Sequence, residues 1–320
     1  MTDNLLEIKN LDVVYRSQKN VLGGESLVYA VNDVSLEIKK GEILAIAGES
    51  GCGKSTLAKT VMKLVTPERG EILFEGKNIL SLNDFYKKVQ IIFQNPYSSL
   101  NPKMKIGEIL REPLEINTKL KKSEIQKIVE DKIQKVGLDK NILKLYPHEF
   151  SGGQRQRIAI ARSLILSPEF IIADEPVSAL DVSIQAQIIN LLKQLKEDFN
   201  LTFLFISHDL SVIKYISDRI AVMYLGEIVE IGLTEEIFSN PKHPYTKALL
   251  SAVPELNPAD EKERISLTGE LPSPENIPSG CKFHTRCPYV MDVCKTIRPE
   301  NIKFSDNHSC KCFLYDNYVV

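Results

Sequence analysis

The chain has 320 residues, of which 43% are apolar and 26% charged, as expected of a globular protein with one large domain and an appendage or two ordinary domains. Its net charge of −2 argues against nucleic acid as the main partner, because binding a phosphate backbone leaves a basic footprint. No apolar run approaches the length needed to cross a bilayer, so a role at a membrane requires a partner.

The N-terminal part predicts a small antiparallel sheet. The opening MTDNLLEIKN is acidic and polar, so we expect no signal peptide. The segments LEIKNLDVVY and VNDVSLEI alternate apolar and polar residues with the period of half-buried strands. Residues 16–30 form an insertion between them.

Four short apolar runs follow, and each leads into a residue that could take part in ligand binding or catalysis. ILAIA at 43–47 precedes Gly48, and VQIIF at 89–93 precedes Gln94. FIIA at 170–173 precedes Asp174 and Glu175, and LFIS at 204–207 precedes His208. Continuous apolarity predicts parallel strands buried on both faces, which bind ligands at their carboxyl ends.

The remaining segments divide the chain further. Residues from about 95 to 167 become helical and charged, which predicts an inserted helical subdomain. Beyond residue 238 the chain becomes proline-rich, which predicts an irregular, loop-rich tail. We therefore expect a first domain over 1–237, which contains the four apolar runs, a C-terminal extension over 238–320, and no internal repeat.

The segment GESGCGKS at 48–55 matches G-x-x-x-x-G-K-[ST] and lies between a predicted strand and a predicted helix. Its glycines let backbone N–H groups surround phosphate oxygens, and the helix N-terminus adds positive potential. Lys54 is expected to reach the β- and γ-phosphates of ATP, and the Ser55 hydroxyl to bind Mg²⁺. Cys52, inside this loop, is expected to be a packing residue.

Two adjacent acids end the third apolar run. Asp174 is expected to bind Mg²⁺ directly or through water, and Glu175 to polarise the attacking water. Taken alone, such a pair could equally cap the following turn. Its combination with the segment at 48–55, called the phosphate loop below, favours a catalytic role for the pair.

The segment SGGQ at 151–154 opens a helix reading RQRIAIARSLIL, and small residues before a helix N-terminus form a second anion-binding nest. With this motif the chain resembles the ABC ATPase family over essentially its whole length. The resemblance implies an α/β fold with a P-loop NTPase core of ABC type: a mostly parallel sheet with helices, an N-terminal antiparallel β subdomain, an inserted helical subdomain and an irregular extension. It also implies two nucleotide-binding subunits packed head to tail, with each SGGQ meeting the γ-phosphate held by the other subunit.

The resemblance assigns further roles residue by residue. Gln94 is similar to the glutamine that senses the γ-phosphate and Mg²⁺ and faces the membrane partner, and His208 to the switch histidine. Asp181 lies in a segment, SALD, that resembles the loop at the dimer seam. Tyr15 resembles the aromatic that stacks on adenine, with Tyr29 as an alternative.

The expected catalytic residues are Glu175, His208 and Gln94, and the expected Mg²⁺ ligands are Ser55, Gln94 and Asp174. The residues expected to contact the nucleotide are Tyr15, Gly48, Glu49, Ser50, Gly51, Cys52, Gly53, Lys54, Ser55, Thr56, Ser151, Gly152, Gly153, Gln154, Asp174 and Asp181.

The C-terminal quarter and KVQIIFQNPYSSLNP at 88–102 resemble the ATPases of oligopeptide and dipeptide importers, particularly the second of their two paired ATPases. This implies an ATP phosphohydrolase that powers peptide uptake from the cytoplasmic face of the membrane as a peripheral subunit. Its expected partners are permease subunits, a second ABC ATPase (itself or a sister chain) and, indirectly, an extracellular solute-binding protein. The same group includes importers of nickel and other small solutes.

Five cysteines fall near the end of the chain, and four are spaced C-x5-C-x6-C-x15-C, unlike the tight C-x2-C pairs of a zinc ribbon. The resemblance implies a [4Fe–4S] cluster on these four, with zinc or free thiols as alternatives. Losing the metal is expected to loosen the tail while largely sparing ATP binding. The four cysteines are Cys281, Cys287, Cys294 and Cys310, and Cys312 is the fifth.

Two other functions compete with the transporter motor. A soluble ABC ATPase acting on DNA or ribosomes usually has two cassettes or a long coiled coil, and neither is evident. An iron–sulfur redox protein with an attached ATPase would need a second cofactor motif, which we do not find.

Overall fold

The computed structural model describes residues 4–18, 25–95, 99–253, 265, 269 and 272–316. Parts of three predicted segments therefore lie outside the described residues: the insertion at 16–30, the segment after Gln94, and the C-terminal extension. The chain divides into two compact units. The first comprises Met1–Ile38, Ile43–Asn78 and Ser207–Val320, and the second Lys39–Glu42 and Ile79–Ile206.

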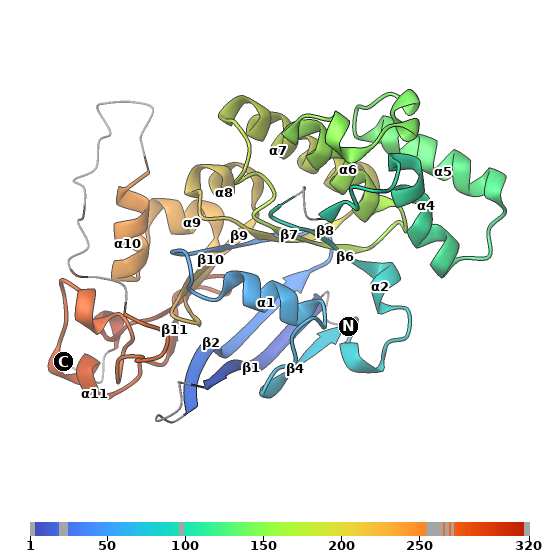
Figure 1. Ribbon diagram of the computed structural model, residues 1–320. Helices are drawn as coiled ribbons and strands as arrows, with labels where there is room; N and C mark the ends of the chain where they lie inside the picture. The colour runs from blue at the N-terminus through green and yellow to red at the C-terminus, as the bar shows by residue number, and fades with distance from the viewer. Residues whose placement is uncertain are drawn as a thin grey trace. The chain divides into compact units, whose positions relative to one another are not determined.

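An antiparallel sheet forms the N-terminal part of the first unit (Figure 1). Strands β1 and β4 pair with Leu6 opposite Phe74 and Ile8 opposite Ile72, which confirms the predicted alternation of buried and exposed residues. The sheet has the strand order β2-β1-β4-β5, made of β1 (Asn4–Gln18), β2 (Glu25–Lys39), β4 (Arg69–Phe74) and β5 (Lys77–Asn78).

The other strands of the first unit form a mixed set. Strand β3 (Ile43–Ala47) is fully buried and pairs in parallel with β9 (Arg219–Tyr224). Strand β9 pairs antiparallel with β10 (Glu227–Leu233). Two short strands of the extension, β12 (Ser309–Lys311) and β11 (Asn301–Lys303), continue from β10 in antiparallel pairs. The proline-rich tail therefore contributes strands to the sheet of the first unit, which its composition alone did not predict.

Short helices complete the first unit. They are α1 (Lys54–Val61), α8 (Leu210–Ile216), α9 (Thr234–Ser239), α10 (Pro244–Ser251), α11 (Asp292–Thr296) and the 3₁₀ turns at His284–Arg286 and Phe313–Tyr315. Three aromatic rings pack beneath the phosphate loop in the core of this unit. The ring centroid of Tyr224 lies 4.7 Å from that of Tyr245 and 5.3 Å from that of Phe283. The core therefore joins β9, α10 and residues 281–312, which carry the five C-terminal cysteines and are called the cysteine segment below.

The second unit contains three parallel strands, β6 (Val89–Ile92), β7 (Phe170–Asp174) and β8 (Thr202–Ile206). Every residue of β7 and β8 is buried, because continuous apolar runs suit strands covered on both faces. The helices of this unit, together with its 3₁₀ turns, are α2 (Phe85–Lys88), α4 (Ile106–Asn117), α5 (Lys122–Lys135), α6 (Gly152–Leu164), α7 (Val182–Phe199), Ile79–Ser81, Lys140–Lys144 and Pro147–Glu149. The predicted helical segment thus contains α4, α5 and α6 (Figure 1).

Among the residues that the structure describes, no helix combines the length and the apolar character that crossing a membrane requires.

Candidate functional site

The phosphate loop connects the end of β3 to the start of α1 in the first unit. Lys54 is buried at the first position of α1, and its ammonium donates to the backbone oxygens of Gly48 at 2.8 Å and Glu49 at 2.9 Å. The loop therefore folds back over the ammonium group of Lys54. Cys52 is also buried, and burial raises the pKa of its thiol, in keeping with a packing role.

The loop packs tightly against its surroundings. At Gly53 the backbone has φ 110°, and a Cβ atom would lie 2.0 Å from the carbonyl oxygen of Ala30. A Cβ at Gly48 would lie 2.2 Å from the carbonyl oxygen of Met223. Both positions require glycine, so the motif's glycines allow the backbone to bend and to approach its neighbours closely.

Glu49 is held from two sides by residues that the sequence did not assign to the site. The Arg286 guanidinium donates to both carboxylate oxygens, at 2.8 Å and 3.1 Å. The backbone N–H of Glu49 donates to the Tyr245 hydroxyl at 2.9 Å. Tyr245 belongs to the segment His243-Pro244-Tyr245 (the HPY segment), which lies in the C-terminal quarter that resembles the peptide-importer ATPases, so that resemblance was the available signal.

The HPY segment builds the start of α10. Its histidine, His243, caps the helix, because Nδ1 accepts the backbone N–H of Tyr245 at 3.1 Å. Pro244 occupies the first helical turn, where its missing N–H costs nothing. Burial lowers the pKa of His243 to about 4, so the ring is neutral near pH 7 with its proton on Nε2. The segment thereby orients Tyr245 toward the phosphate loop.

Three further candidates of the first unit, His208, Tyr15 and Tyr29, are exposed. His208 is exposed just before α8, a helix capped by the Asp209 carboxylate, which accepts the N–H groups of Ser211 and Val212. Tyr15 and Tyr29 are 42% and 38% exposed, on the neighbouring strands β1 and β2. Both rings stay candidates for stacking on adenine.

The predicted acids of the second unit follow β7 as expected. Asp174 is buried at the end of this strand. Glu175 has φ 47°, a left-handed conformation uncommon for a residue with a side chain, and its N–H donates to the Ile206 oxygen at 2.9 Å. Its carboxylate accepts the Gln94 Nε2–H bond at 2.8 Å. The structure thus brings two predicted catalytic residues into direct contact.

The SGGQ segment forms the N-terminus of α6. The Ser151 hydroxyl accepts the Gln154 N–H at 3.4 Å, and the Gln154 side chain accepts the Ser151 N–H at 3.1 Å. This reciprocal arrangement is a capping box. A Cβ at Gly153 would lie 2.6 Å from Ile184 of α7, so α6 and α7 approach too closely for a larger residue. Asp181 is exposed immediately before α7.

The five cysteines of the extension lie near one another. The Cys281 N–H donates to the Cys294 oxygen at 2.8 Å. Burial raises the pKa of Cys281 to about 12, and neighbouring thiols, including those of Cys294 and Cys287, add to the effect. Within the described parts of the chain, however, no group of three or more His, Cys, Asp or Glu side chains is arranged to hold a metal. The structure therefore does not support the cluster expected from the resemblance.

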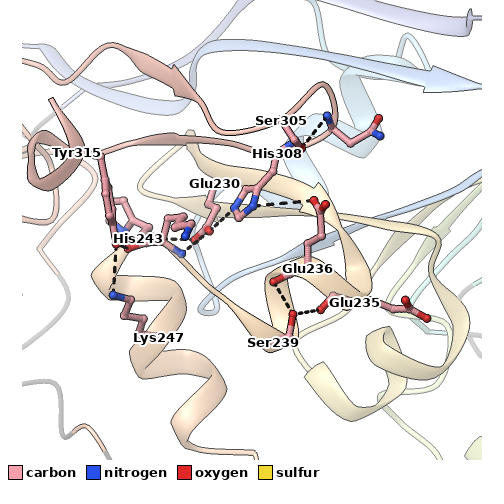
Figure 2. Close-up of polar contacts among 11 residues, drawn as sticks. Glu230, Glu235, Glu236, Ser239, His243, Lys247, Ser305, His308 and Tyr315 are labelled. Carbon is pink, nitrogen blue, oxygen red and sulfur yellow. Dashed lines mark hydrogen bonds and ion pairs between the residues drawn. The ribbon is translucent and has the colours of Figure 1, made fainter. Parts of the chain in front are cut away.

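A buried carboxylate attaches the cysteine segment to the core (Figure 2). Glu230 of β10 accepts the backbone N–H groups of Lys242 and His243, at 2.6 Å and 2.9 Å, and its Oε1 lies 2.8 Å from Nε2 of His308. Burial opposes ionisation of Glu230, but these hydrogen bonds outweigh it and lower its pKa. Because the Glu230 carboxylate is hydrogen-bonded to His308, just before β12, it helps to hold β12, the strand that carries Cys310, against β10.

Comparison with known proteins agrees with this architecture. The ABC transporter family matches residues 31–178, and the oligopeptide/dipeptide transporter C-terminal region matches residues 229–294. The dipeptide transport ATP-binding protein DppF of Haemophilus influenzae is 50% identical, over 98% of this chain and 97% of its own length. The oligopeptide transport ATP-binding protein AppF of Bacillus subtilis is 52% identical, over 90% of each chain.

Solved structures give the same result. The ATP-binding cassette MJ0796, described as a dimer in a post-hydrolysis state bound to ADP and Pi, is 30% identical with a TM-score of 0.63, over 72% of this chain and 98% of that one. The cbiO1 protein of Clostridium perfringens, part of an ABC transporter complex, is 28% identical with a TM-score of 0.64, over 74% of this chain and 92% of that one.

Fold and motifs together define an α/β P-loop ATPase of the ABC class. The chain belongs to the ABC transporter family as an ATP-hydrolysing subunit, and it carries the C-terminal region of the oligopeptide/dipeptide transporters.

Proposed function

We propose that this ATPase powers the uptake of dipeptides or oligopeptides, as a peripheral subunit on the cytoplasmic face of the membrane. The observation that carries the proposal is the oligopeptide/dipeptide C-terminal region at 229–294, together with about half-identical relatives named for peptide transport over nearly the whole chain. Permease subunits form the path, and an extracellular solute-binding protein delivers the peptide.

The first unit supplies the groups that hold the ATP phosphates. The N–H groups of residues 48–55 and the N-terminus of α1 provide donors and positive potential. Lys54 exchanges its bonds to the Gly48 and Glu49 oxygens for bonds to the β- and γ-phosphates. His208, exposed before α8, is a contact for the γ-phosphate.

The second unit supplies the groups that act on water. Glu175 is the general base that orients the attacking water and receives its proton at a carboxylate oxygen. Its Oε2 already accepts the Gln94 amide, but a carboxylate offers about four acceptor sites, so it can bind a water as well. Gln94 thereby positions the base and relays the presence of the γ-phosphate.

Mg²⁺ belongs to the proposed reaction because it neutralises charge on the transferring phosphoryl group. The residues proposed to hold it are Ser55, Gln94 and Asp174. Their hydroxyl, amide and carboxylate oxygens are the donor set that Mg²⁺ prefers, so the residues fit the ion chemically.

A groove in the second unit supports a permease as the partner. It has a volume of about 290 Å³ and lies beside the strand that leads to Gln94. Ile116, 75% exposed, lines it, and such an exposed apolar side chain suits a partner helix. Other lining residues are Tyr86, Gln90, Phe93, Pro113 and Arg162.

The test is purification of the intact complex from membranes, followed by peptide-stimulated ATP hydrolysis. We expect Ile116→Glu to lower co-purification of the permease at least about tenfold, because a charge would be buried in the interface. Leu80→Glu, at an equally exposed site outside the groove, is the matched control and should co-purify normally. Stimulation by nickel rather than by peptides would contradict the proposed substrate.

We further propose that Cys281, Cys287, Cys294 and Cys310 bind a [4Fe–4S] cluster, with zinc as the alternative. The proposal rests on the family resemblance and on the proximity of these thiols: Cys294 and Cys310 are buried, Cys281 and Cys287 are partly buried, and Cys310 pairs across the sheet with Glu230. Because burial favours the protonated thiols, metal binding must release protons and draw the side chains together. The bound metal would supply a structural crosslink in a segment of few apolar residues.

Protein purified without exposure to air should be brown, and its visible absorption should bleach on reduction. Changing any one of the four cysteines to serine should remove the colour, whereas Cys312→Ser should retain it. Metal analysis with sulfide determination makes the measurement quantitative. Stoichiometric zinc without iron or sulfide would exclude the cluster.

A further inference from the structure

The cysteine segment reaches the phosphate loop through one arginine. Arg286, in the 3₁₀ turn just before Cys287, forms a two-pronged ion pair with Glu49, the second residue of GESGCGKS. The side chains are 8% and 27% exposed, so the pair is partly shielded from water. Two parallel charged hydrogen bonds also fix the relative orientation of the two planar groups.

The same loop residue is held through its backbone. Its N–H donates to the Tyr245 hydroxyl, and its carbonyl oxygen accepts the Lys54 ammonium. Tyr245 is itself fully buried against Tyr224 and Phe283, and Phe283 lies three residues before Arg286. Side chain, N–H and carbonyl of Glu49 are thus all engaged, and two of the three partners come from the C-terminal region.

We propose that Arg286, assisted by Tyr245, is a positioning residue for the phosphate loop, which sets the ATP affinity of the subunit. When the loop N–H groups are already in place, phosphate binds without the cost of ordering the loop. Removing the anchor therefore raises the free energy of the binding-competent loop conformation relative to the other conformations of the loop. The inference rests on the proposed phosphate-binding role of this loop.

This geometry changes one expectation drawn from the sequence. Damage to the cysteine segment was expected to spare ATP binding largely, but Arg286 is adjacent to Cys287 in the chain. Disturbing that turn moves the Glu49 anchor, so nucleotide affinity should follow the integrity of the segment.

The experiment measures the Kd of MgATP for the full-length chain, together with KM and kcat. Arg286→Ala should raise Kd and KM about three- to tenfold and change kcat less, because the loop is needed in ground and transition states alike. Arg286→Lys keeps the charge but loses the two-pronged geometry, so its Kd should lie between those of the wild type and Arg286→Ala. Arg298→Ala is the matched control: it removes a more exposed arginine of the same segment, paired with Glu227, and should bind as wild type.

A double-mutant cycle separates positioning from general loosening of the tail. Glu49→Gln removes the same ion pair from the loop side and leaves the cysteine segment unchanged. If the pair carries the effect, the double variant with Arg286→Ala binds no more weakly than either single variant. Additive losses, or wild-type affinity in Arg286→Ala or Glu49→Gln, would overturn the proposal. Lys54→Ala tests the loop separately: retained MgATP binding in that variant would refute the phosphate-binding role itself.

Discussion

Glu175→Gln should lower ATP turnover by about 10²–10⁴, because the amide keeps the shape of the side chain but cannot take the proton of the attacking water. Glu175 follows a fully buried strand and adopts φ 47°, an uncommon backbone conformation of the kind found at functional sites. In the wild-type chain, the hydrogen bond from Gln94 holds the Glu175 carboxylate in one orientation. The measurement is single-turnover hydrolysis at saturating MgATP.

A matched control distinguishes loss of the base from loss of any acid. Glu169→Gln changes a half-buried glutamate one residue before β7, whose carboxylate pairs with Lys40 and Lys88 at 3.4 Å. Such surface pairs contribute little stability, so the control should hydrolyse ATP normally. Glu175→Gln should also bind MgATP with near-wild-type affinity, because Lys54 and the phosphate loop are intact. Near-normal hydrolysis in this variant would remove Glu175 from the role of base.

Local features of the fold could be predicted because their causes are local. The apolar runs before Gly48, Asp174 and His208 indicated buried strands, and the structure confirms β3, β7 and β8. SGGQ was predicted to precede a helix, and α6 in fact begins within it, at Gly152. Ser151 and Gln154 form a capping box there, a contact that four consecutive residues make on their own.

Features that join distant segments could not be predicted in this way. Glu49 contacts Tyr245 and Arg286, which lie 196 and 237 residues further along the chain. Nothing in the local sequence distinguishes Arg286 from the other basic residues of the tail. The pairing of β10 with β12 escaped prediction too, because three-residue strands give no reliable periodicity. These contacts depend on tertiary packing, which overrides composition.

Ser151 variants should lose hydrolysis while the isolated chain keeps its affinity for ATP, if SGGQ completes the pocket of a second subunit. The proposed pairing is supported by the cassette MJ0796, a solved relative described as a dimer bound to ADP and Pi. A hydroxyl that donates to the γ-phosphate stabilises charge in the transition state, so Ser151→Ala should reduce turnover about 10²-fold.

The hydroxyl also caps α6, and the two roles must be separated. Ser151→Asp keeps a capping acceptor but places a negative charge at the partner's γ-phosphate, so it should abolish hydrolysis without lowering the melting temperature. The control is Asp139→Ala, which removes a comparable cap, the acceptor of the Asn141 N–H at 2.7 Å, at another site in the same unit. This control should lose a little stability and keep its turnover.

Dilution provides an independent measurement of the shared site. If two subunits form each pocket, hydrolysis by the wild type should rise more steeply than linearly with protein concentration until the dimer dominates. Mixing Ser151→Asp with Lys54→Ala should restore part of the activity, because one of the two pockets in each mixed dimer is then intact on both sides. Constant activity per molecule down to verified monomers, with no restoration on mixing, would show that each chain hydrolyses ATP alone and that Ser151 acts only as a cap.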